Sequence, residues 1–186
     1  MLALPLACTT TIVQPTKPSE PVKVYLINHG YTSSLALPTP DGGMIRYVYG
    51  DWNYYALGNR GLLDALFALF WPTRGTLGRQ RIDGASDVES LRSQVGVEIQ
   101  QIHTLEVERS EVERLTTRLE AILEGQRESL VVNVANGMEF GHHPQTYNYF
   151  HNSNHVTARW LKELGCHVHG PAFSSRWEVS PPATGR

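Results

Sequence analysis

The 186-residue sequence lacks several features that mark specialised classes of protein. It has only two cysteines, so no framework of intrachain disulfides can be inferred. No run reaches the roughly 18 apolar residues that span a bilayer, and the candidate at 62–71 is interrupted by Asp64. Lys and Arg do not cluster, and the formal net charge of -2 argues against a nucleic-acid partner. With 41% hydrophobic and 18% charged residues, the chain suits one globular domain.

The first eight residues, "MLALPLAC", end in a motif similar to the tail of a bacterial lipoprotein signal, in which Cys8 would be acylated. The charged region that precedes such a signal is missing, and Pro5 stands where Leu is preferred, so an ordinary N-terminus remains the alternative. Residues 9–21 contain three prolines spaced as in a semi-rigid tether. We therefore expect residues 1–21 to be a signal remnant or lipoprotein tether, which would join the protein to a membrane through its N-terminal lipid.

Residues 22–170 form the predicted single domain, and 171–186 a Pro-rich C-terminal tail. Runs of β-branched and aromatic residues, interrupted by Gly and Pro, predict strands. Apolar spacing of three and four predicts helices. By these rules we expect strands at 22–30, 33–38, 44–55, 76–82 and 129–135, the last one buried, and helices at 62–70 and 87–93.

The segment 97–125 predicts a strand followed by a helix. Ser110 and Glu113 have the spacing of a capping box at the helix start, and Gly125 ends the helix. The apolar residues fall on one helical stripe, which we expect to be buried: Val112, Leu115, Leu119, Ile122 and Leu123.

The stretch "FHNSNHVTARWLKELG" (150–165) indicates a helix from about 154 to 164, ended by Gly165. Ser153 lies at its start and has two interpretations. It is a plain N-cap, like its neighbours Asn152 and Asn154. Alternatively it is a nucleophile, because the free N–H groups and the positive end of the helix dipole stabilise a developing anion.

At this point the sequence resembles an uncharacterised bacterial envelope family, "domain of unknown function 2459", which is sometimes encoded near urease operons. The resemblance covers most of the chain and rests on four motifs in the family's order: "HGYTSSLALP" (29–38), "YGDWNYY" (49–55), "LFALFWPTRGTL" (66–77) and "NSNHVTARWLKELG" (152–165). The family looks like a circularly permuted relative of NlpC-type papain-like hydrolases. The resemblance implies an α+β fold with a small antiparallel sheet, packed helices, and acyl transfer or hydrolysis at an amide or ester.

Two catalytic positions of the family are replaced here. The family's Cys falls on Ser153 and its second His on Thr32, whereas its first His is kept as His29. A serine hydroxyl is unreactive unless a base takes its proton, so the thiol mechanism is lost. Either His29 or His155 serves as the base for Ser153, with Asp51 orienting the histidine, or the site has become a non-catalytic pocket.

The same residues have ordinary structural interpretations. A lone His at a strand end is usually a packed or solvent-exposed polar residue, and Gly-Asp is usually a turn. The remaining histidines show no recognised metal spacing, so we expect no metal and no cofactor. His167 and His169 suit an exposed edge strand, with Cys166 facing the other way. Core packing is favoured over a ligand cleft for the aromatic residues Tyr47, Tyr49, Trp52, Tyr54 and Tyr55.

We therefore expect a protein of the periplasm or cell envelope with a permuted papain-like fold. It acts as a binding module, a degenerate hydrolase whose pocket holds a cell-wall peptide or a lipid-derived small substrate. The alternative is a serine-dependent hydrolase or acyltransferase. The catalytic set is then Ser153, His29 and Asp51, and the residues expected to line the pocket are Thr32, Asn152, His155 and Trp52.

Overall fold

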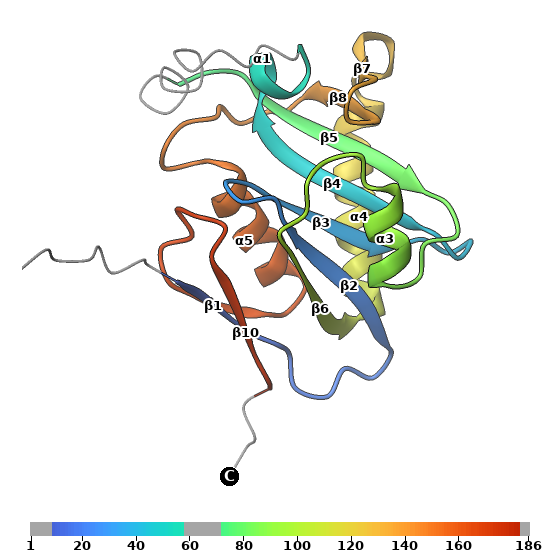
Figure 1. Ribbon diagram of the computed structural model, residues 1–186, viewed down its shortest axis with the longest axis vertical. Helices are drawn as coiled ribbons and strands as arrows, with labels where there is room; N and C mark the ends of the chain where they lie inside the picture. Colours follow the sequence, from blue (N-terminus) through green and yellow to red (C-terminus); the bar gives the residue numbers. More distant parts are fainter. Residues whose placement is uncertain (1–8, 58–71, 183–186) are drawn as a thin grey trace, which may run out of the picture.

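The computed structural model describes residues 9–57 and 72–182. Cys8 and the helix predicted at 62–70 lie outside these ranges. The fold is α+β, as predicted, with a seven-stranded antiparallel sheet and a three-stranded mixed sheet joined by helices and loops (Figure 1). Over the described ranges, no helix has the length and apolar character needed to cross a membrane.

The larger sheet has seven strands, all paired antiparallel, in the order β6-β2-β3-β4-β5-β8-β7. Their bounds are β2 Pro21–Asn28, β3 Ser33–Pro38, β4 Met44–Asp51, β5 Gly75–Ile82, β6 Gln101–Glu108, β7 Val131–Asn133 and β8 Met138–His142. The described helices are α1 Trp52–Tyr55, α3 Val88–Gln94, α4 Arg109–Glu124 and α5 Ser153–Glu163, with a short 3-10 helix at Arg127–Ser129.

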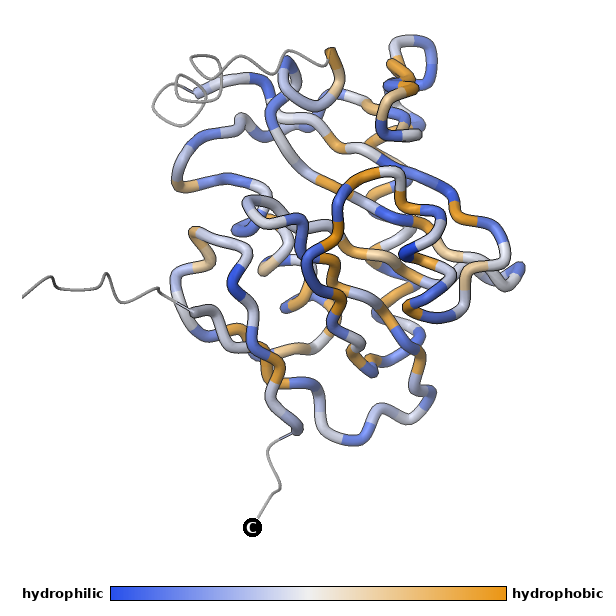
Figure 2. The backbone as a smooth tube through the Cα atoms, viewed as in Figure 1, coloured by the Kyte–Doolittle hydropathy of each residue, from blue (hydrophilic) through white to orange (hydrophobic). Residues whose placement is uncertain are grey.

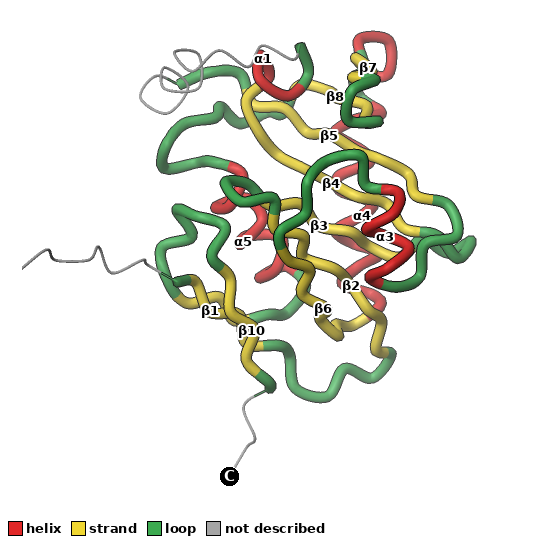
Figure 3. The backbone as a smooth tube through the Cα atoms, viewed as in Figure 1, coloured by secondary structure: helices red, strands yellow, loops and turns green. Residues whose placement is uncertain are grey.

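Helices cover both faces of this sheet, with α3 on one face and α4 and α5 on the other (Figures 1 and 3). We call these the α3 face and the α5 face. Successive side chains of a strand point to opposite faces, so β2 sends Leu26 to the core under α5 and Ile27 to the core beside Leu91 of α3. Hydrophobic residues accordingly gather at the centre of the molecule (Figure 2).

The stripe predicted on α4 is confirmed for Val112, Leu115, Leu119 and Leu123, which are buried, whereas Ile122 is only partly buried against the core. The prediction of a capping box formed by Ser110 and Glu113 is wrong. The helix begins at Arg109, so Glu108 occupies the N-cap position and Ser110 already lies in the first turn. The Glu108 carboxylate accepts hydrogen bonds from the backbone and hydroxyl of Ser19 instead, at 2.6 and 2.9 Å, so a tertiary contact replaces the local motif.

A three-stranded sheet contains segments that the sequence analysis assigned to the tether and the tail. In it β1 (Thr10–Val13) lies between β9 (His167–His169) and β10 (Trp177–Ser180), parallel to β10 and antiparallel to β9. Ile12 is fully buried in the main core. The folded part therefore extends on both sides of the predicted bounds 22–170, through a pairing that no local pattern reveals.

The prediction of a buried strand at 129–135 is also wrong. The strand β7 is short and lies at the edge of the large sheet. Val132 is 61% exposed, and Val134, just beyond the strand, is 88% exposed. A run of β-branched residues indicates a strand, but only the sheet order decides whether its faces are covered.

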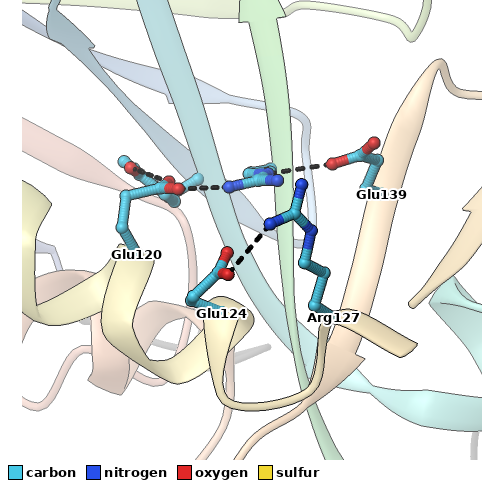
Figure 4. Close-up of polar contacts among 6 residues, drawn as sticks. Glu120, Glu124, Arg127 and Glu139 are labelled. Carbon is cyan, nitrogen blue, oxygen red and sulfur yellow. Dashed lines mark hydrogen bonds and ion pairs between the residues drawn. The ribbon is translucent and has the colours of Figure 1, made fainter. Parts of the chain in front are cut away.

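An ion network joins α4 to the sheet. The Arg79 guanidinium on β5 pairs with Glu120 of α4 and with Glu139 of β8, and these two carboxylates lie on either side of it (Figure 4). Tyr47 donates its hydroxyl to Glu120 at 2.6 Å, and burial raises the pKa of this phenol. Because the charged groups are partly exposed, each pair contributes at most about 1 kcal/mol.

Candidate functional site

The loop after β2 meets the start of α5, as the sequence analysis expected. Ser33 donates its hydroxyl to Asn154 Oδ1 at 2.9 Å, and Asn154 Nδ2 donates to the backbone oxygen of Tyr31 at 3.0 Å. Ser33 also accepts a hydrogen bond from the indole of Trp177 at 2.7 Å. These buried contacts fix the early loop, the first turn of α5 and β10 against one another.

Asn152, and not Ser153, caps α5. Its Oδ1 accepts from the backbone N–H groups of Asn154 and His155 at 3.0 and 3.1 Å. Ser153 is the first helical residue, is 2% exposed, and its hydroxyl has no hydrogen-bond partner among the described residues. A serine hydroxyl without a base is not activated, so this position has neither of its two predicted roles. Asn152 was expected to line the pocket and instead serves as the cap.

His29 turns away from Ser153, and the predicted pair is not formed. The His29 Nε2 atom lies 2.9 Å from Ser34 Oγ, and Nδ1 lies 2.8 Å from the backbone oxygen of Glu98. Ser33 bonds to α5, so the next residue, Ser34, points to the opposite α3 face and holds the imidazole there. The reason for the error is this alternation along β3.

The contacts of His29 define which of its ring nitrogens carries the proton. A carbonyl oxygen only accepts, so Nδ1 carries the proton and Nε2 accepts from the Ser34 hydroxyl. Burial lowers the pKa of His29 to about 4, against the effect of the Glu98 hydrogen bond and with help from the positive charge of Arg46. The imidazole is therefore neutral at neutral pH.

Asp51 does not orient a histidine. One carboxylate oxygen caps α1 by accepting from Tyr54 N at 2.8 Å, and the other accepts from the Thr73 hydroxyl. The sequence analysis interpreted Gly-Asp as a turn; Asp51 is instead the last residue of β4 and the N-cap of α1. Trp52 packs its ring against His142, with centroids 3.9 Å apart.

His155 also lies away from the expected pocket. Its Nδ1 lies 3.0 Å from Asn152 Oδ1, and its ring packs edge-on against Phe173. Of the four residues expected to line a pocket, only Thr32 borders the cavity described next.

A cavity of about 330 Å³ opens on the α3 face, between β3, β4, α1 and the turn that joins β7 to β8. His29 and Ser34 form part of its wall. The other described lining residues are Tyr31, Thr32, Arg46, Val48, Tyr54, Tyr55, Val97, Glu98, Asn133, Asn136 and Met138.

Arg46 is a charged residue of the cavity wall that sequence reasoning missed. It lies on β4, paired with Ala36, and is 1% exposed. Its Nε and Nη2 atoms are buried without a hydrogen-bond partner in the part of the chain that the structure describes. Burial lowers the pKa of Arg46 to about 10, so the guanidinium keeps its charge at neutral pH. The only signal in the sequence is one Arg within the apolar run "MIRYVYG".

The aromatic residues divide between the two interpretations considered for them. Tyr47 and Tyr49 are fully buried in the core, as favoured. Tyr54 and Tyr55 line the cavity. The division follows the elements, because β4 sends its tyrosines to the α5 face and α1 lies at the mouth of the α3 face.

The other His, Cys, Asp and Glu residues within the described ranges form no metal-binding cluster. No group of three or more His, Cys, Asp or Glu residues suited to a metal occurs within 9–57 and 72–182. His167 and His169 are exposed on the edge strand β9, as predicted. Cys166 is buried, and burial raises the pKa of its thiol to about 12.

Comparisons with protein-family models, with curated proteins and with solved structures find no match to this chain, so its site is interpreted from its own geometry.

Proposed function

We propose that this protein is a small-ligand-binding module with a permuted papain-like fold, a degenerate hydrolase in which Ser153 is not a nucleophile. The observation that carries the proposal is the position of His29. Its two ring nitrogens are occupied by Ser34 and Glu98 at the wall of a cavity, on the sheet face opposite Ser153. A serine nucleophile needs a base within hydrogen-bond reach, and Ser153 has none among the described residues.

Two further features support the permuted papain-like assignment. The strand pair that carries His29 precedes α5 in the chain, and the start of α5 packs against that pair through Ser33 and Asn154. The sheet is antiparallel and carries α5 on one face. Both features agree with the family resemblance of the sequence motifs.

The proposed ligand is a cell-wall peptide or a lipid-derived small molecule, and the proposed location is the periplasm or cell envelope. The location rests on the motif that ends in Cys8, which would attach the protein to the membrane if it is acylated. Intact mass of the membrane-extracted protein tests this directly, because acylation adds the mass of the lipid and removes the residues before Cys8.

A second candidate function is a hydrolase or acyltransferase that uses Ser34. The Ser34 hydroxyl donates to His29 Nε2 at 2.9 Å, and the Glu98 carbonyl orients the imidazole, which is the arrangement of a nucleophile and its base. Against it, Ser34 is fully buried, and the group that orients His29 is a neutral backbone oxygen, which lacks the negative charge that stabilises an imidazolium.

A fluorophosphonate probe separates these functions, because it labels only activated serines. We expect no labelling of the wild-type protein, and the same result for Ser153→Ala and Ser34→Ala. Labelling mapped to Ser153 by peptide mass spectrometry would overturn the proposal. Labelling at Ser34 that is lost in Ser34→Ala would establish the second candidate.

Binding itself is tested by a ligand-observed NMR screen of small polar and aromatic compounds. We expect Thr32→Phe to lose the binding of compounds that bind the wild type, because Thr32 borders the cavity and a phenylalanine ring at this position narrows it. Unchanged binding in Thr32→Phe would place the ligands elsewhere and contradict the proposal.

A further inference from the structure

We propose that Arg46 is the receptor for a carboxylate group of the ligand, held in the cavity by two parallel hydrogen bonds from the guanidinium. The inference rests on the proposed binding function and adds the chemical class of the ligand: a monoanionic carboxylate with a small apolar or aromatic body.

The first support is that Arg46 is buried without a counter-ion. It forms no ion pair with any described carboxylate, and the titratable groups that interact with its charge are the Tyr55 phenol and the His29 imidazole, neither of which is a carboxylate. Removing an unpaired charge from water is costly, so buried charges are normally paired. A bound anion would supply the missing partner.

The second support is the geometry of the free donors. The N–H groups of Nε and Nη2 lie along one edge of the guanidinium plane, and both are unused. This edge matches the two oxygens of a carboxylate, which accept two parallel hydrogen bonds. A single-point acceptor, such as an amide oxygen, would satisfy only one of them.

Several other polar groups of the wall already have partners. Asn133 donates to the backbone oxygen of Tyr55 at 2.8 Å, and Asn136 accepts from Met138 N at 3.2 Å. Both ring nitrogens of His29 are used by Ser34 and Glu98. Arg46 is thus the group of the described wall with unused charged donors.

The charge balance favours a monoanion over a phosphate. Among the described lining residues Arg46 is the only permanent cation, His29 is neutral at neutral pH, and Glu98 is an acid. One carboxylate neutralises one guanidinium, whereas a phosphate dianion leaves excess negative charge beside Glu98. Val48, Val97 and Met138 give the wall apolar surface for the body of the ligand.

The test compares benzoate with its neutral analogue benzamide, by NMR titration of the full chain at constant ionic strength in chloride. We expect benzoate to bind at least tenfold more tightly than benzamide, and Arg46→Met to abolish this preference. The side chain of Met replaces the guanidinium without a charge, so we expect the variant to fold and to keep its melting temperature or gain a few degrees. Arg46→Lys should retain a weaker preference, since it supplies charge without the paired donors.

Arg81→Met is the matched control. Arg81 is a half-exposed arginine on β5 that pairs with Asp41 and Asp83, away from the cavity wall, and its loss should leave benzoate binding unchanged. Equal binding of benzoate and benzamide, or an unchanged preference in Arg46→Met, would overturn the inference and leave the binding function in place. Tighter binding of inorganic phosphate than of benzoate would overturn the carboxylate assignment.

Two sources of the carboxylate are distinguished by a second pair of probes. N-acetyl-alanyl-alanine represents a free peptide terminus, and its C-terminal amide is the control. Peptide binding that is tighter than benzoate binding and is lost in the amide indicates a peptide terminus. The reverse order indicates a free small acid. Both results support the carboxylate receptor, and fluorophosphonate labelling remains the separate test of the non-catalytic function.

Discussion

Ser33 and Ser34 are adjacent in sequence and lie in unlike environments. Ser33 joins a buried hydrogen-bond network with Asn154 and Trp177 on the α5 face. Ser34 holds His29 on the α3 face. Successive side chains of a strand point to opposite faces, so His29, which Ser34 holds, lies on the sheet face opposite the contacts of Ser33. One residue of register therefore decides which serine the imidazole meets.

The lowered pKa of His29 predicts a pH dependence of folding. In the unfolded chain the imidazole has its ordinary pKa of 6.5, and in the folded protein a pKa of about 4. Between these values the unfolded state binds the proton and the folded state does not. The contribution of His29 to the free energy of unfolding is therefore fully present above about pH 6.5 and is lost as the pH drops toward 4. The full effect is about 3 kcal/mol.

We therefore expect His29→Gln to flatten the pH dependence of the free energy of unfolding, measured by urea titration between about pH 7 and about pH 4.5. The other histidines whose pKa is lowered, such as His143, are present in both proteins, so the difference between the two curves reports His29. Parallel curves would contradict the buried neutral imidazole.

Asn152 and Ser153 make a second contrast between neighbours. We expect Asn152→Ala to reduce the free energy of unfolding by about 1 kcal/mol, because two N–H groups of α5 lose their acceptor. Ser153→Ala removes a hydroxyl with no partner among the described residues and should cost less. Urea unfolding of the two variants checks this. An equal or larger loss of the free energy of unfolding for Ser153→Ala would mean that Ser153 is the N-cap of α5.

The sequence predicted part of the site, and the part that it missed depends on two residues, Arg46 and His29. The early loop and α5 were expected to meet, and they do, through Asn154. Arg46 was missed because a lone charge in an apolar strand carries no local pattern; only the burial of its surroundings makes it unusual. The direction of His29 depends on Glu98, which is distant in sequence and carries no signal of its own.

Elements with strong local patterns were predicted well. α5 ends as expected, with Gly165 at a φ of +84° and Cys166 N donating back to the Leu161 oxygen, a helix stop that glycine favours. The strands predicted at 22–30 and 33–38 are present as β2 and β3, which pair antiparallel. β1 and β10 were not predicted, because their pairing joins Thr10–Val13 to Trp177–Ser180 and the prolines near them suggested a tether and a tail.

The position of β1 predicts that part of the expected tether supports the core. Ile12 is fully buried against the main core, so we expect Ile12→Ala to reduce the free energy of unfolding by about 2–4 kcal/mol. Thr16→Ala is the matched control, since Thr16 is exposed in the same segment and should change stability by less than about 0.5 kcal/mol. Equal small effects in denaturant unfolding would mean that this segment is a tether after all.

At the scale of the whole molecule, the two sheets share one hydrophobic core. The core under the α5 face includes Ile12 of β1, Trp177 of β10 and the buried stripes of α4 and α5. Hence β1 and β10, the first and last described strands, lie beside α5, which also covers the large sheet (Figure 1). The cavity lies on the other face, so the α5 face provides stability while the α3 face carries the proposed site.

Cys166 reports on the integrity of this shared core. It follows α5 directly, is 4% exposed, and belongs to the main core, and burial raises the pKa of its thiol to about 12. The thiolate is the nucleophile that attacks a thiol-specific reagent, so both burial and the raised pKa protect the folded protein. We expect a Cys8→Ser protein to react through Cys166 roughly a thousandfold more slowly without urea than in denaturing urea.

The reaction is followed with Ellman's reagent, and Cys8→Ser/Cys166→Ser serves as the unreactive control. If β1, β9, β10 and α5 unfold together with the large sheet, the reaction rate should track the free energy of unfolding across urea concentrations, and Ile12→Ala should accelerate it in proportion to its loss of stability. Fast modification of the native protein would instead show that the three-stranded sheet opens by itself, because the thiol lies where that sheet meets α5. Such independent opening would separate the molecule into two cooperative units in spite of its continuous core.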